Sequence, residues 1–435
     1  NQSVALDRKL RSKLHSRSLL FDQKTAATQD YDLIYLITSE GFEELCEIDS
    51  RFLKFRSTLF SETSVSMDRN VQEKDVVEML DKNVNAFLSL AAPYYQILPA
   101  VKAMEWLVRR FYANIHNAEM MLLTALPHYG TPVFVKVLNV VPQSSFPKIF
   151  EWVTGYKTLL KSPTSASLVK AFSDPLFFQF YSMHLIELSK NGSIYKEQIV
   201  LFLANLVQVI GLLSRQPEKL TEQFLPRILE AVGQLLSQGG TDAILTAFSI
   251  ISVLGSVLPL SLNTIDSLVS LIIESDIESL QKQSLITIGL LFHGKAQSEI
   301  EQSKAISTVP VKFILKYGPE IIQEGVKLQD FLIAYFLATE NLEVFPLLDL
   351  SKSRNFEAVS LVILENAGQD PKIPSICEKL LSHDREQFLV ALNKFKDGFK
   401  LTDLEMILMT TLDNLVESVE SVEPDNSDNE DVADD

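Results

Sequence analysis

Apolar positions along this chain recur every three or four residues, which is the spacing of one buried face of an α-helix. The first such stripe predicts a helix in residues 28–48. Thr28 is expected to cap this helix, and Asp30 and Asp32 fall in its first turn, where the helix dipole favours negative charge. The expected buried face consists of Ile34, Ile37, Gly41, Leu45 and Ile48.

Two more amphipathic helices follow. A polar stretch at 61–70 predicts a loop before the second helix, and Pro93 is expected to end that helix. The third helix begins after Pro99 and is expected to reach residue 116. The predicted buried positions are Val76, Leu80, Val84, Phe87, Leu88 and Ala91 in the second helix, and Val101, Met104, Leu107, Val108, Phe111 and Ile115 in the third.

The middle of the chain contains a weak internal repeat. An amphipathic helix at 222–240 precedes an almost wholly apolar one at 241–258, and residues 261–275 and 276–292 repeat this order. A helix pair with this period, about 36 to 38 residues, is typical of HEAT-type repeats, in which neighbouring pairs must stack to bury their apolar faces. The sequence therefore predicts an all-α fold, a HEAT-like α-solenoid of stacked helix pairs.

One apolar stretch requires a separate interpretation. Residues 243–265 contain no charged side chain and are long enough to cross a bilayer, which takes about 20 apolar residues. Ser, Thr and Asn side chains interrupt the stretch, however, and Pro259 lies within it. We interpret it as a buried helix, a turn and the start of another helix, and we expect no membrane association.

The formal net charge of −17 is unevenly distributed. The segment 417–435 has nine acidic residues and no basic one, so 416–435 is expected to be an acidic disordered tail or linker. Five cations lie near the other end, and we define 1–27 as a basic N-terminal segment. The solenoid is expected to fill 28–415. Within it, eight Lys or Arg accompany three Glu between residues 102 and 170.

Cysteine usage and the first residues give two further expectations. Cys46 and Cys377 are far apart in sequence, which favours a reducing compartment and two buried thiols over a disulfide framework. The sequence starts at Asn1 without a signal-peptide pattern or an initiator methionine, so we expect it to be a fragment.

The sharpest resemblance to a catalytic motif is GLLFHGKA at 289–296. It matches the first seven positions of the phosphate-binding pattern GxxxxGK[ST]. That pattern binds phosphates between a strand and a helix, whereas this stretch falls at a helix end and has Ala296 in place of the metal-binding hydroxyl. Gly294 is interpreted as a helix C-cap.

No other motif suggests chemistry. The six histidines do not pair with one another or with cysteine at metal-ligand spacing. Hydrolase and metalloprotease motifs are absent from the sequence. We therefore expect no enzyme activity, no cofactor, no metal and no small-molecule substrate.

What remains are surfaces. Cations around an exposed tryptophan on the third helix would hold phosphates and stack a base. The alternative is a solvated helix face with a Glu105–Arg109 pair and Trp106 buried against a neighbouring repeat. The N-terminal cations have comparable alternatives, namely an RNA contact, a nuclear or nucleolar address, or a frayed helix end. The candidate RNA or partner surface comprises Arg8, Lys9, Arg11, Lys13, Arg17, Lys102, Trp106, Arg109 and Arg110.

Several short sequence segments in the first 140 residues resemble one protein family. In order they are SLLFDQKTAATQDYD (18–32), GFEELCEID (41–49), TLFSETSVSMDRNVQ (58–72), LDKNVNAFLSLAAPYY (80–95) and AMEWLVRRF (103–111). They are similar to the N-terminal region of the U3 small nucleolar RNA-associated protein 10 family, fungal type, whose animal counterpart is HEAT repeat-containing protein 1. Beyond these residues we expect agreement only in helical-repeat character.

The resemblance implies a non-catalytic nucleolar scaffold of the small-subunit processome that supports 18S rRNA maturation. Implied partners are other subunits of the early processome subcomplex, with the pre-rRNA 5′ external transcribed spacer or the U3 ribonucleoprotein as RNA partners. The alternative is an importin-like transport adaptor that binds basic cargo. The Trp/Asn ladder of such carriers is absent, since the sequence has only two tryptophans, both before residue 155.

Overall fold

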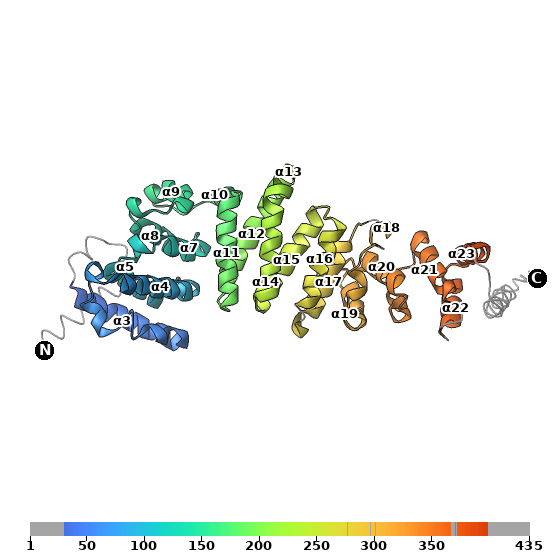
Figure 1. The fold of residues 1–435 in the computed structure, drawn as a ribbon, viewed down its shortest axis with the longest axis horizontal. Coiled ribbons are helices and arrows are strands. Elements are labelled where there is room, and N and C mark those ends of the chain that lie inside the picture. Colours follow the sequence, from blue (N-terminus) through green and yellow to red (C-terminus); the bar gives the residue numbers. More distant parts are fainter. Residues whose placement is uncertain are drawn as a thin grey trace, which may run out of the picture. The chain divides into compact units, whose positions relative to one another are not determined.

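The computed structural model describes residues 30–398 except 276, 296, 301, 367–369 and 371. Within these residues it contains helices and turns and no strand (Figure 1). The helices stack against their neighbours in chain order, which confirms the all-α solenoid. The basic segment at 1–27 and the acidic tail at 416–435 lie outside the described residues, and both domain assignments stay predictions.

The described residues form two compact units, with a boundary between Ile250 and Ile251. In the first unit, α3 packs against α5, α10 against α12, and α11 against α14. Short 3-10 turns connect many of the helices. Its helices are α3 (Tyr31–Ile48), α4 (Lys74–Ala91), α5 (Leu98–Phe111), α6 (Ala113–His116), α7 (Ala118–Ala125), α8 (Pro132–Val140), α9 (Thr154–Leu159), α10 (Ser165–Phe172), α11 (Pro175–Lys190), α12 (Lys196–Leu213), α13 (Pro217–Lys219) and α14 (Leu225–Gln238).

Helix α15 (Thr241–Val257) contains the boundary, and the second unit continues from there. In this unit α17 packs against α19 and α20, and α21 packs against α23. The remaining helices are α16 (Leu262–Glu274), α17 (Gln281–Phe292), α18 (Gln297–Ile300), α19 (Val311–Gln323), α20 (Gln329–Thr339), α21 (Ser353–Glu365), α22 (Ile373–His383) and α23 (Arg385–Gly398).

The first helix differs from its prediction at both ends. Helix α3 begins at Tyr31, so Asp30 occupies the cap position and Asp32 alone lies in the first turn. Thr28, the predicted cap, lies outside the described residues. The predicted buried stripe is correct except for Ile48, which is 53% exposed because it is the last residue of the helix.

Helices α4 and α5 largely follow their stripes. Helix α4 ends at Ala91, and a 3-10 turn containing Pro93 follows it, as predicted. Val76 is exposed, contrary to prediction. The third helix is shorter than predicted because Tyr112 adopts φ 55°, a left-handed conformation that interrupts the helix, and Ile115 is exposed on the separate turn α6.

The four helices of the internal repeat are confirmed as α14 to α17. Pro226 lies in the first turn of α14, directly after a π-helical turn at Leu220–Phe224. The uncharged run at 243–265 divides into α15 and the start of α16, with Pro259 in the turn between them. Among the described helices, only α12 is long and apolar enough to cross a membrane by composition, and it packs against α10 through its buried side.

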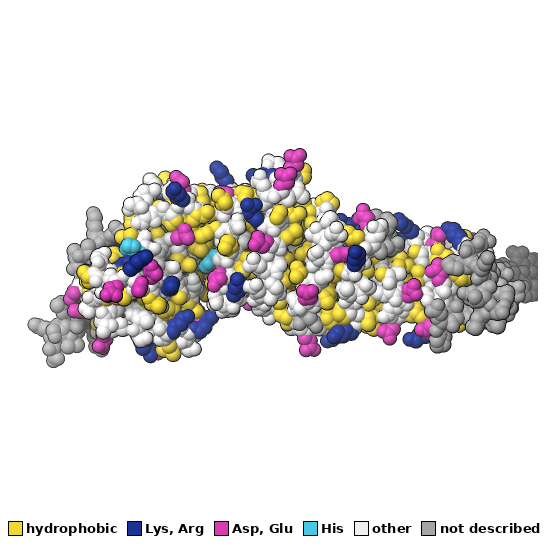
Figure 2. All heavy atoms as spheres, in the orientation of Figure 1, with side chains coloured by type: hydrophobic (Ala, Val, Ile, Leu, Met, Phe, Trp, Pro, Cys, Tyr) yellow, Lys and Arg dark blue, Asp and Glu magenta, His cyan; other side chains and the backbone are white. Residues whose placement is uncertain are grey.

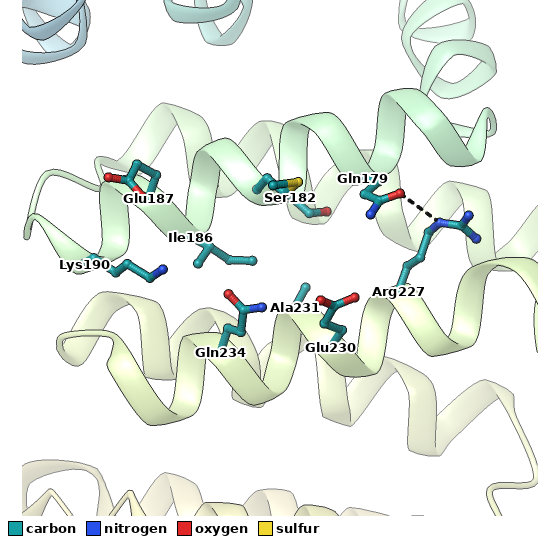
Figure 3. Close-up of a pocket in the computed structure, with 10 residues that line it drawn as sticks. Gln179, Ser182, Ile186, Glu187, Lys190, Arg227, Glu230, Ala231 and Gln234 are labelled. Carbon is teal, nitrogen blue, oxygen red and sulfur yellow. Dashed lines mark hydrogen bonds between the residues drawn. The ribbon is translucent and has the colours of Figure 1, made fainter. Parts of the chain in front are cut away.

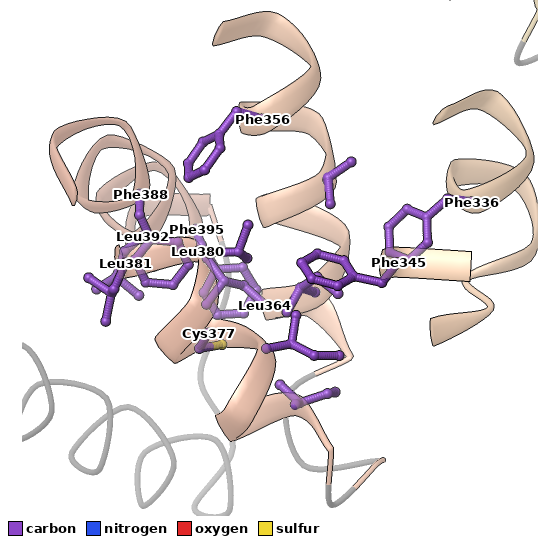
Figure 4. Packing of buried hydrophobic residues seen from close by; sticks show 14 of the residues in the cluster. Phe336, Phe345, Phe356, Leu364, Cys377, Leu380, Leu381, Phe388, Leu392 and Phe395 are labelled. Carbon is purple, nitrogen blue, oxygen red and sulfur yellow. The ribbon is translucent and has the colours of Figure 1, made fainter. Parts of the chain in front are cut away.

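The core of the second unit ends in a cluster of apolar side chains from α20 to α23 (Figure 4). Phe356, Leu380 and Phe388 are fully buried in it. Cys377 is a member of this cluster, and burial raises the pKa of its thiol to about 12. Both cysteines are free thiols, as the sequence predicted, with Cys46 only partly buried.

Helix α11 carries two polar rings on its inner side, the buried Tyr181 and the partly buried His184. Tyr181 stacks on Phe202 with ring centroids 6.1 Å apart, and it lies 6.4 Å from His184. The Tyr181 hydroxyl and His184 Nε2 have no hydrogen-bond partner among the described residues. Burial lowers the pKa of His184 from 6.5 to about 4, because an imidazolium would lose its hydration there.

Phe388→Ala is expected to lower the free energy of unfolding by about 3–5 kcal/mol, because it removes a fully buried ring from the cluster. Val390→Ala, on the same helix at 51% exposure, should change it by less than about 0.5 kcal/mol. Urea denaturation followed by circular dichroism measures both. Equal effects of the two variants would contradict the packing of α23.

Stability is expected to fall as the pH drops from about 6.5 towards 4, since the unfolded chain then binds a proton at His184 that the folded chain does not. The size of this loss is up to about 3 kcal/mol, and it is complete below the native pKa. His184→Gln should remove that part of the dependence in denaturation measured at several pH values. An unchanged pH profile in the variant would show that His184 is not buried in its neutral form.

Candidate RNA- or partner-binding surface

Trp106 is a core residue of the first unit. Its side chain is fully buried, and the indole N–H donates a hydrogen bond to the backbone carbonyl of Leu59 at 2.9 Å. The ring packs against Tyr35, with centroids 5.1 Å apart. The prediction of an exposed stacking platform is therefore wrong, and the alternative of a buried tryptophan is correct. Its polar atom is satisfied locally, as burial requires.

Lys102 is buried as well, at 5% exposure. Its Nζ lies 3.3 Å from Glu40 and 3.6 Å from Glu44, one turn apart on α3. The helices approach closely here, because a Cβ added to Gly41 would lie 2.7 Å from Cβ of Lys102. Lys102 therefore neutralises two glutamates at a tight helix contact and offers no charge to an external ligand.

Arg109 and Arg110 lie in the last turn of α5, where cations stabilise the helix dipole. Arg109 is about half buried, and burial lowers its pKa. The Nε of Arg110 donates to the carbonyl of Ser64 at 2.9 Å, and its guanidinium lies 5.0 Å from the centroid of the Tyr31 ring. Arg110 is thus held by two contacts while its side chain stays partly exposed.

Two tyrosines that the sequence analysis missed adjoin Arg110. Tyr31 and Tyr112 are each 38% exposed. A hydrogen bond between their hydroxyls is the main cause that raises the pKa of Tyr112. Their separation in sequence hides this pairing, since it depends on α3 lying against α5. We call Tyr31, Arg110 and Tyr112 the tyrosine–arginine patch.

The nine predicted surface residues thus divide into three groups. Trp106 and Lys102 are buried, Arg110 belongs to the patch, and Arg109 adjoins it through its backbone carbonyl, 3.5 Å from the Tyr31 hydroxyl. The five N-terminal cations lie outside the described residues: Arg8, Lys9, Arg11, Lys13 and Arg17. On the face drawn in Figure 2, basic side chains of the first unit are interspersed with acidic ones and form no continuous basic surface.

The described part of the phosphate-pattern stretch, residues 289–295, is a helix end, as predicted. Helix α17 ends at Phe292, and Gly294 has φ 74°, the left-handed conformation that glycine adopts without strain. Asp330 accepts hydrogen bonds from His293 Nδ1 and from the backbone N–H of Gly294. The Nζ of Lys295 donates to the carbonyl of Leu260 at 2.7 Å. The Asp330 carboxylate therefore already accepts the hydrogen bond of the Gly294 backbone N–H, which a bound phosphate would need.

A groove of about 210 Å³ runs between α11 and α14 (Figure 3). Its floor is formed by the buried residues Ser182, Ile186 and Ala231. Arg227 Nε donates to Gln179 Oε1 across it at 3.4 Å. Two acids and two bases line the groove, so its charge is balanced and suits a protein surface better than a phosphate chain. The charged members are Glu187, Lys190, Arg227 and Glu230.

The described residues contain no group of three or more His, Cys, Asp or Glu side chains that could hold a metal.

Comparison with known proteins adds a sequence relationship. A family model described as U3 small nucleolar RNA-associated protein 10 matches residues 220–339. This match lies well beyond the first 140 residues. The expectation that only helical-repeat character would agree there is therefore wrong.

Fungal proteins named U3 small nucleolar RNA-associated protein 10 match most of the chain. The Scheffersomyces stipitis protein is 48% identical over 94% of this chain and 24% of its own length. The Debaryomyces hansenii protein is 45% identical over 96% of this chain and 24% of its own length. The Saccharomyces cerevisiae protein is 38% identical over 72% of this chain and 18% of its own length. The chain thus spans about a quarter of the length of the first two.

In a Trp152→Phe variant, the remaining fluorescence from Trp106 is expected to be blue-shifted and poorly quenched by acrylamide, because the indole is fully buried. Urea-unfolded protein serves as the accessible control. Quenching as efficient in the folded variant as in the unfolded one would contradict the burial of Trp106.

Proposed function

Because the chain belongs to the family of U3 small nucleolar RNA-associated protein 10, we propose that it acts as a non-catalytic scaffold in the small-subunit processome. In this role it supports pre-18S rRNA processing and early ribosome assembly in the nucleolus. The partners are other subunits of the early processome subcomplex. The observation that carries the proposal is the high identity to these relatives along nearly the whole chain.

The form of the described residues supports a scaffold. Helices stacked in order present long surfaces formed by many separate side chains, which suits extended partners. The groove between α11 and α14 is one such surface, with balanced charge and a partly apolar floor. Its chemistry suits a protein partner.

The tyrosine–arginine patch is the proposed RNA contact within the described residues. The guanidinium of Arg110 supplies a positive charge for a phosphate, and the exposed rings of Tyr31 and Tyr112 supply π faces for unpaired bases. The N-terminal cations Arg8 to Arg17 would add electrostatic attraction to the same pre-rRNA partner.

The importin-like alternative has less support. Carriers of that class bind cargo with exposed tryptophans, whereas Trp106 is fully buried and Trp152 packs edge-on against Phe177 with ring centroids 5.7 Å apart. A transport adaptor would also bind a basic signal peptide in isolation, which the scaffold would not.

The scaffold proposal is tested by purification of the tagged chain from fungal extract before and after ribonuclease treatment. A protein scaffold retains other processome subunits after the RNA is digested. Loss of every subunit on digestion would contradict binding through protein surfaces. Recovery of a basic cargo protein with no processome subunit would favour the transport adaptor.

Arg110→Ala is expected to weaken binding of single-stranded 5′ spacer RNA about 3- to 10-fold and to reduce the slope of log affinity against log salt by about 1, because one phosphate contact is lost. Lys74→Ala is the matched control, since Lys74 is exposed on α4 and pairs with Glu78. Fluorescence anisotropy at several salt concentrations measures both variants. An unchanged affinity and slope for Arg110→Ala would exclude the patch as an RNA contact.

A further inference from the structure

Helix α9 ends at a leucine with an unusual backbone conformation. Leu160 has φ 51°, in the left-handed region. The backbone N–H of Leu160 donates to the carbonyl of Lys157, and that of Lys161 donates to the carbonyl of Tyr156, each at 3.1 Å. This pair of bonds is the Schellman motif, in which glycine is the usual residue at the left-handed position.

A leucine at this position costs about 1–2 kcal/mol relative to glycine, because its Cβ approaches the following carbonyl. Among the described residues other than glycines, Tyr112 and Glu340 also have positive φ. The side chains of both make a recorded contact, Tyr112 with Tyr31 and Glu340 with Asn366. The side chain of Leu160 is 61% exposed, so burial within the described residues does not offset its strain.

Leu160 is one half of an exposed apolar pair. Leu159, the last residue of α9, is 63% exposed. Two neighbouring leucines that both face solvent form a small apolar feature. Helix α9 lies near α8 and α10 in the first unit (Figure 1).

The segment that contains this pair is basic in sequence. Residues 152–173 contain three lysines and no acidic residue, and the nearest acids in sequence are Glu151 and Asp174. Lys161, next to Leu160, is exposed. An apolar pair beside the exposed Lys161 is complementary to a partner that combines apolar anchors with carboxylates.

The segment is also held in place. The Tyr156 hydroxyl hydrogen-bonds Ser167 of α10, and Lys157 Nζ donates to the carbonyl of Val141 after α8. These contacts fix both sides of α9, so that the leucines need little further ordering on binding. Such pre-organisation favours affinity.

We propose that Leu159, Leu160 and Lys161 form a docking site for a protein segment in which leucine or phenylalanine anchors are flanked by aspartate or glutamate. Aliphatic side chains offer no π face for a nucleobase, which favours a protein over RNA here. The site is separate from the tyrosine–arginine patch and stands whether or not that patch binds RNA.

The decisive variant is Leu160→Gly, because it should affect stability and partner binding in opposite directions. Glycine relieves the left-handed strain, so the melting temperature should stay the same or rise. Partner binding should fall at least tenfold, because the anchor contact is lost. Lys161→Glu should also weaken binding through charge repulsion. Leu212→Ala, at a 53% exposed position on α12, is the control that should leave binding unchanged.

The probe is an array of 15-residue peptides with Leu or Phe at every third or fourth position and Asp, Glu, Ser or Ala elsewhere. In two matched arrays, Lys replaces the acids or Ala replaces the anchors. The complete chain should bind the first array, and Leu160→Gly should not. Absence of binding to the first array, equal binding to the lysine array, or unchanged binding by Leu160→Gly would overturn the proposal. Binding of a uridine 20-mer that Leu160→Gly abolishes would assign the site to RNA instead.

Discussion

No helix of this chain can bury its apolar stripe by itself, and every other feature of the structure depends on that constraint. Where helices approach closely, the sequence supplies small residues and local partners for polar atoms. Gly41 lets α3 meet α5, Lys102 neutralises two glutamates at the contact, and the Trp106 indole finds the Leu59 carbonyl. Lys102 and Trp106, which the sequence analysis considered as surface residues, therefore serve the packing of α3 against α5.

Turns between helices obey the same constraint, because their backbone groups must be satisfied as well. Asp330 accepts from the turn after α17, and Asp266 accepts from Ser303 and the backbone N–H of Lys304. In both cases a carboxylate on one helix fixes a turn that is distant in sequence. Residues 293–295 of the phosphate-like stretch form one of these turns, so Gly294 and Lys295 have a structural explanation.

Periodicity was sufficient to predict much of the fold. Helices α14 to α17 were recovered because two alternating helix types repeat there, and the division near Pro259 followed from proline chemistry. Helix ends were predicted less well. Tyr112 interrupts the third helix in a left-handed conformation, which no rule for aromatic residues predicts. Ile48 and Val76 follow the helical spacing but lie near helix ends, where no other helix of the described residues covers them.

The candidate sites were harder to predict than the fold. Which face of α5 is buried depends on its neighbours on both sides, so amphipathic spacing alone could not decide between an exposed and a buried Trp106. Tyr31 joins Arg110 only through the packing of α3 on α5. Leu160 is visible only through its backbone angle and its exposure. The candidate surfaces in the described part of the chain are therefore small and distributed over several helices.

The central claim, that this chain is a scaffold acting through such surfaces, is tested most directly by cross-linking mass spectrometry on purified small-subunit processomes. The account predicts cross-links from exposed lysines near α9 and α11, namely Lys161 and Lys190, to other protein subunits. Cross-links confined to this protein itself, with none to another subunit, would contradict it.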